Sequence, residues 1–114
     1  MKYQQTQEIS REVAIKTFLT GSNSEICDAL LAVAFYDNDW RWSQAQCLHF
    51  LNHDASNVRA IASTCLGHIA RIHKNLDREL VVDTLKNHLK DQSISGTVED
   101  ALDDIHVFLG DDKG

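Results

Sequence analysis

The chain has 114 residues, which suits one domain with a real hydrophobic core and excludes two catalytic domains. Hydrophobic residues make up 43% and charged residues 25%, a composition typical of a globular protein and not of a disordered or fibrous one. The net charge is −6, and residues 91–114 carry the whole imbalance, with seven acidic residues and one basic residue, so direct binding of nucleic acid is not expected.

Other sequence features concern the compartment. No apolar run reaches the roughly 20 residues of a membrane span, and residues 1–8 lack the apolar core of a signal peptide. Cys27, Cys47 and Cys65 are an odd number of widely spaced thiols inside apolar patterns, which argues against a disulfide framework. We therefore expect a cytoplasmic protein without a membrane partner.

Apolar residues recur at spacings of three and four, and there is no proline, so the predicted class is all-α, with about six helices stacked as antiparallel hairpins. The first helix is predicted over residues 8–19 and to end at Gly21 in a left-handed cap. Its predicted inward residues are Ile9, Val13 and Ile15.

Capping signals mark the next two helices. Ser22 and Glu25 have capping-box spacing for a second helix that ends near residues 36–38. Asp39 is a candidate cap for a third helix over residues 40–52. That helix is predicted to be apolar on two sides, with one stripe of Trp42, Ala45, Leu48 and Leu51 and another of Trp40, Cys47 and Phe50.

The fourth helix, residues 57–74, has the strongest amphipathic pattern, with Val58, Ile61, Ala62, Cys65, Leu66, Ile69 and Ile72 inward. Asp77 is predicted to cap a fifth helix that holds Leu80, Val81, Leu85 and Leu89. Thr97 and Asp100 have capping-box spacing for a sixth. That helix is predicted to end at Gly110, and residues 1–6 and 111–114 are expected to fray.

A weak period of close to 40 residues relates these hairpins, which suits helix-pair repeats. The central residues Asp54, Val58, Arg59, Ala62, Leu66 and Ile69 resemble a HEAT repeat. That resemblance implies a short α-solenoid over residues 1–114, in which Asp54 and Arg59 bond along the stack. The outer helix pairs lack the Asp and Arg, so they are expected to be diverged or capping units.

A longer string also carries a resemblance, running from Asp39-Trp40-Arg41-Trp42 through Cys65-Leu66-Gly67-His68 to Val98-Glu99-Asp100-Ala101 and Asp104-Ile105. It is similar to small bacterial HEAT-like proteins that are taken to be immunity proteins of contact-dependent or other polymorphic toxins. The resemblance implies a chain that is not an enzyme and whose partner is a cognate toxin with a basic surface, such as a nuclease. A monomer is expected before the complex forms.

The core stripe of the sixth helix predicts that Glu99, Asp100, Asp103 and Asp104 point outward, with Asp111 and Asp112 just beyond. Like charges at this spacing destabilise an isolated helix slightly, which hints at a function in binding a basic partner. The alternative is a solvated face that only favours solubility, because acidic residues near a helix N-terminus also stabilise its dipole.

A second candidate surface combines aromatic and acidic residues around one turn. Asp37, Asp39 and Trp40 could anchor a basic partner, with Trp40 partly exposed. Trp42 lies on the apolar stripe and is predicted to belong to the core.

The six histidines predict no metal, cofactor or catalytic site. His49 and His53 are spaced i, i+4 but lack a HExxH glutamate and a visible third ligand. No nucleophile can be paired with a base, since buried structural thiols are much commoner than nucleophilic ones. The leading hypothesis is therefore a toxin-binding immunity protein. The alternative is a HEAT-like adaptor or lyase-type accessory module that uses the central repeat around Arg59, Ser63 and Arg71.

Overall fold

The computed structural model describes residues 7–110, so the ends expected to fray, including Asp111 and Asp112, lie outside the described residues. The described chain consists of six α-helices and one short 3-10 helix, which confirms the all-α class. They are α1 (Arg11–Thr20), α2 (Asn23–Tyr36), α3 (Trp40–Phe50), α4 (Ser56–His73), α5 (Arg78–Asn87), η1 (His88–Lys90) and α6 (Ser95–Leu109). No helix among residues 7–110 has the length and apolar character needed to cross a bilayer.

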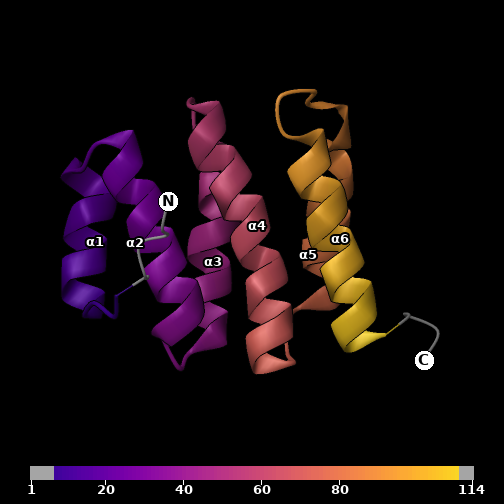
Figure 1. The fold of residues 1–114 in the computed structure, drawn as a ribbon, viewed down its shortest axis with the longest axis horizontal. Coiled ribbons are helices and arrows are strands. Elements are labelled where there is room, and N and C mark those ends of the chain that lie inside the picture. The colour runs from indigo at the N-terminus through magenta and orange to yellow at the C-terminus, as the bar shows by residue number, and fades with distance from the viewer. Residues whose placement is uncertain (1–6, 111–114) are drawn as a thin grey trace, which may run out of the picture.

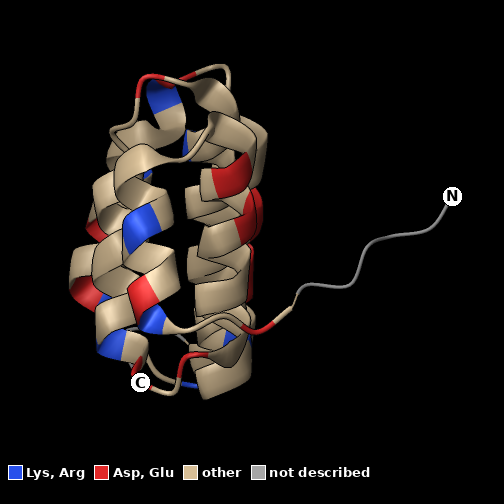
Figure 2. Ribbon diagram, turned by 90° about the vertical axis from the view of Figure 1, so that its left-hand side faces the viewer, with Lys and Arg blue, Asp and Glu red and all other residues tan. Residues whose placement is uncertain are grey.

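The helices stand roughly side by side in two layers (Figures 1 and 2). In Figure 1, α2, α4 and α6 form the front layer, with α3 and α5 behind them. The most extensive helix contacts are those of α4 with α6, α2 and α3, so α4 is the centre of the stack. A hydrophobic cluster runs from α2 to α6 through fully buried residues of α4 such as Val58, Leu66 and Ile69.

The capping predictions for α2 and α3 are confirmed. The Ser22 hydroxyl accepts from the backbone N–H of Glu25 at 3.2 Å, and the Glu25 carboxylate accepts from the N–H of Ser22 at 2.8 Å. Asp39 accepts from the N–H groups of Arg41 and Trp42. Each cap is local in sequence, so the residue spacing alone was enough to identify it.

The predicted capping box at Thr97 and Asp100 is wrong. Helix α6 begins two residues before Thr97, at Ser95, and its N-cap residue Ile94 has no capping side chain. Thr97 instead donates to the carbonyl of Ile94 at 2.9 Å and lies 2.9 Å from the hydroxyl of Ser63 on α4. Its hydroxyl therefore contributes to helix packing. Asp77 is the N-cap residue of α5 as predicted, but its side chain makes no capping bond.

The inward face predicted for α1 is also wrong. Val13 is 52% and Ile15 43% exposed, whereas Ala14 is buried and Phe18 packs on Phe50 with ring centroids 5.1 Å apart. Because α1 lies at one end of the stack, it has a neighbour on one side only (Figure 1), and its apolar residues exceed the surface it can bury.

Gly21 follows α1 without the predicted left-handed conformation, because its φ of −80° is ordinary extended backbone. A Cβ at this position would lie 2.8 Å from the carbonyl oxygen of Thr17. Glycine is therefore required by lack of space at the tight turn and not by its backbone angle.

In the remaining helices the inward residues are mostly as predicted. Helix α4 buries the predicted stripe, with Ile61 and Ile72 half-buried. On α5, Val81 and Leu85 are buried but Leu80 is exposed. Leu89, which lies in η1 beyond the end of α5, is exposed, and so is Ala45 on α3. Helices α3 and α5 form the back layer, which is covered by other helices on one side only, so apolar residues on their outer side stay exposed.

Candidate protein-binding surface

Three carboxylates of the predicted α6 surface project outward. Glu99, Asp100 and Asp103 are exposed, because the buried stripe of α6 is formed by Val98, Ala101 and Ile105. Within residues 7–110, none of the three carboxylates takes part in an ion pair or a side-chain hydrogen bond. Figure 2 shows acidic positions along the outer side of the right-hand layer, which is the front layer of Figure 1.

Asp104 does not point outward as predicted. It is half-buried at the contact between α6 and α4, where its Oδ2 atom would lie 2.8 Å from a Cβ at Gly67. The Cα of Ala101 would lie 3.3 Å from the same Cβ, so the missing side chain of Gly67 allows α6 to approach α4 closely. Asp104 is thus a packing residue with one edge at the surface.

Next to Asp104, aromatic and basic side chains cross from α4 to α2. The ring of His68 stacks on Phe35 with centroids 4.9 Å apart, and the Arg71 guanidinium donates to the Nδ1 atom of His68 at 3.1 Å. Burial and the charge of Arg71 lower the pKa of His68, although Asp104 acts in the opposite direction. The neutral ring is therefore the form that this environment favours.

The carboxylates around the α2–α3 turn are held by the protein itself. Asp37 accepts from the Nη2 of Arg11 at 2.9 Å and from the backbone N–H of Asp39 at 2.9 Å. Although partial burial raises the pKa of Asp37, the hydrogen bonds from Arg11 and from the backbone of Asp39 lower it overall. Asp39 caps α3, and its Oδ2 lies 3.7 Å from Arg11. Both residues therefore have structural roles in the folded chain.

The burial of the two tryptophans differs less than predicted. Trp40 is half-buried, with the Arg41 guanidinium 4.5 Å from its ring centroid, which agrees with the expected partial exposure. Trp42 is also only half-buried, although the α1 residue Arg11 covers its ring at 4.2 Å. The prediction that Trp42 is a core residue is therefore wrong.

The structure does not join the two predicted surfaces. The α2–α3 turn lies at the lower end of the stack in Figure 1, whereas α6 begins at the upper end, and α4 stands between α2 and α6. The acidic surface is therefore defined as Glu99, Asp100 and Asp103, with Asp104 at its edge.

A solved structure has this fold. One chain of the crystal structure of a CDI complex from Cupriavidus taiwanensis LMG 19424 matches with a TM-score of 0.86 and 32% sequence identity, over 95% of the present chain and 97% of that chain. The protein belongs to the family of that CDI-complex chain. No family model and no curated protein matches the sequence. The CDI part of the resemblance is thereby confirmed, whereas the HEAT repeat stays a prediction.

The central arginine of this CDI-complex family member has a partner that was not predicted. Arg59 Nε donates to Oδ2 of Asp91 at 3.0 Å, and Nη2 donates to the hydroxyl of Ser93 at 3.1 Å. Nη1 donates to the backbone carbonyls of His53 and Asp54, both at 2.8 Å. The predicted bond to the Asp54 carboxylate is therefore wrong, since Asp54 contributes its backbone oxygen and Asp91 the charge.

The contacts of Ser93 and Arg59 also change the pKa of Asp91. Hydrogen bonds from the hydroxyl and backbone N–H of Ser93, followed by those of Arg59, lower the pKa of Asp91. Asp91 and Ser93 lie more than 30 positions after Arg59 in the sequence. The HEAT pattern points only to the local turn, so it gave no signal for them.

The thiols of this family member lie in the hydrophobic core, where Cys47 is next to Cys65. Cys65 is fully buried, and a hydrogen bond with Cys47 together with burial raises its pKa well above the ordinary value. Such a thiol is a poor nucleophile at neutral pH. In residues 7–110, no group of three or more His, Cys, Asp or Glu side chains is arranged to hold a metal.

Proposed function

We propose that this protein is the immunity member of a contact-dependent growth inhibition (CDI) pair, which binds a cognate toxin in the cytoplasm and neutralises it. The observation that carries the proposal is the similarity to a chain of a CDI complex over almost the full length of both chains. A common fold with 32% identity favours a common kind of protein partner.

The charge of the chain supports the immunity role over the toxin role. A nuclease toxin must hold an anionic nucleic acid, so its cleft is basic, whereas this chain has a net charge of −6. Carboxylates of the acidic surface that have no partner in the described chain can approach such a cleft without first breaking internal ion pairs. Complementary potentials also raise association rates.

The first experiment is co-expression with the protein encoded by the adjacent open reading frame. We expect that protein to arrest growth when expressed alone, and the present chain to restore growth and co-purify in a one-to-one complex. Growth arrest by the present chain alone would make it the toxin member. A toxic neighbour that forms no complex with it would remove the immunity proposal.

The acidic surface is tested by the double substitution Asp100→Lys and Asp103→Lys. We expect an unchanged fold, an association rate lower by about tenfold or more at low salt, and weaker protection, because charge reversal removes electrostatic steering. The matched control reverses two exposed carboxylates of α5, Glu79→Lys and Asp83→Lys, with the same change in net charge. Equal loss in both variants would show that total charge, and not the α6 surface, governs binding.

A further inference from the structure

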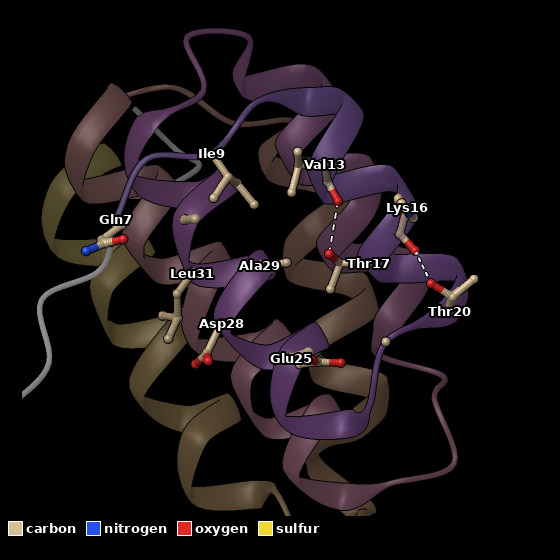
Figure 3. A pocket seen from close by; sticks show the side chains of 12 residues that line it. Gln7, Ile9, Val13, Lys16, Thr17, Thr20, Glu25, Asp28, Ala29 and Leu31 are labelled. Atoms are coloured by element: carbon tan, nitrogen blue, oxygen red, sulfur yellow. Dashed lines mark hydrogen bonds between the residues drawn. The ribbon is translucent and has the colours of Figure 1, made fainter.

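A groove of about 640 Å³ lies between α1 and α2, and no pattern in the sequence predicted it (Figure 3). Val13 of α1 and Ala29 and Ala32 of α2 line it, and Ile9 lies at one side. Val13 is 52% exposed. An apolar side chain left open beside a cavity favours burial against a further molecule.

The two hydroxyl groups in the α1 wall are already bonded. The hydroxyl of Thr17 donates to the carbonyl of Val13, and that of Thr20 donates to the carbonyl of Lys16, both at 2.9 Å (Figure 3). These two side chains therefore offer the groove their methyl groups and no free hydroxyl hydrogen. The donors left in the lining are Gln7 and Lys16, and the threonine methyl groups together with Val13 offer apolar contact to an aliphatic side chain.

Charged groups at the border of the groove favour a basic occupant. Its lining includes two carboxylates, Glu25 and Asp28 on α2, and one cation, Lys16 on α1. Asp28 is exposed and forms no ion pair or side-chain hydrogen bond with any residue in the range 7–110. The carboxylate of Glu25 is fixed by its bond from the N–H of Ser22 at 2.8 Å, which gives the border a negative charge of defined position.

We propose that the groove receives a segment of the toxin in which an aliphatic side chain stands beside a lysine or arginine. The aliphatic group packs on Val13 and Ala29, and the cation pairs with Asp28. This inference rests on the proposed immunity function, but it concerns a surface at the opposite end of the stack from α6 (Figure 1). The toxin would then be held at two sites, one for steering and one for apolar burial.

The first test compares Val13→Lys with Ile15→Lys by calorimetry against the protein from the adjacent open reading frame. Ile15 is the matched control, since it is an apolar residue of the same helix, is 43% exposed and does not line the groove. We expect Val13→Lys to weaken binding by about tenfold or more and Ile15→Lys to leave it unchanged. Asp28→Lys should weaken binding, and Asp83→Lys on α5 should not.

Equal affinities of Val13→Lys, Ile15→Lys and the unaltered chain would overturn the groove proposal and leave the immunity function intact. Circular dichroism identifies a variant that fails to fold, and Val13→Asn then replaces Val13→Lys. A wild-type chain that forms no complex would instead count against the function.

The second test needs no toxin. Backbone amide shifts of the 15N-labelled chain are followed during titration with the peptide acetyl-Lys-Leu-Leu-Lys-amide, with its glutamate counterpart as control. We expect shifts at Val13, Asp28 and Ala29 with the lysine peptide only, and no such shifts would overturn the proposal. Groove shifts caused by deletion of residues 1–6, or by dilution of the protein alone, would assign the groove to the chain's own N-terminal segment or to a second copy, and would also overturn it.

Discussion

Substitution of Arg59 by alanine should destabilise the fold measurably, because one guanidinium joins two separate turns. Its Nη1 atom donates to the carbonyls of His53 and Asp54, and its side chain is only 20% exposed. Loss of a charged donor leaves each of these carbonyls poorly satisfied, at about 1–1.5 kcal/mol each, so the free energy of unfolding should fall by about 2–3 kcal/mol. For a domain of this size, that corresponds to a melting temperature lower by about 8–12 °C.

The assay is urea and thermal denaturation followed by circular dichroism, with Asp54→Ala as the control. Because Asp54 contributes only its backbone oxygen, its truncation should change the free energy of unfolding by less than about 0.5 kcal/mol. Arg59→Lys should recover part of the loss, since an ammonium group cannot serve all four acceptors. An unchanged melting temperature for Arg59→Ala, or an equal loss for Asp54→Ala, would refute this account of the network.

Two further predictions concern α4. Gly67→Val should lower the free energy of unfolding by about 1–3 kcal/mol in urea denaturation, because the new side chain would press on Ala101 and Asp104, and a variant as stable as the parent would contradict the close approach of α6. The pKa of His68 in the folded chain lies below its ordinary value of 6.5, so on acidification the unfolded chain binds more protons than the folded chain. The stability contributed by the neutral ring is therefore present above pH 6.5 and is lost as the pH falls through the folded-state pKa. His68→Leu should therefore lose less stability than the parent between about pH 7.5 and about pH 5, and equal losses would count against the role of this ring.

Local signals in the sequence predicted the helices well. The Ser22–Glu25 box and the Asp39 cap depend on residues three positions apart or fewer, and the stripe of α4 depends on one helical period. The face of α1 could not be derived in the same way. Its apolar residues surround most of the helix, so the choice between Val13 and Ala14 is made by the neighbours in space.

The candidate surface could be predicted only in part, because helical periodicity is a local signal. Helical periodicity placed Glu99, Asp100 and Asp103 outside, but it could not show that Gly67 would admit α6 so closely that Asp104 is half-buried. The carboxylate partner of Arg59 is a contact between distant turns, and the α1–α2 groove is a property of two packed helices. No spacing rule within one helix describes either of them.

The unequal burial of the helices gives the molecule a gradient of local stability. Helix α4 buries a whole face, whereas in α1 only Ala14 is buried, so α1 should open at a lower free energy and exchange its amide hydrogens sooner. The α1–α2 groove thus has one wall on a firmly packed helix and one on the helix that is held least. Such a site can adjust its width to the segment it receives, so if the groove binds a toxin segment as proposed, side chains that differ by a methyl group or two should both fit it.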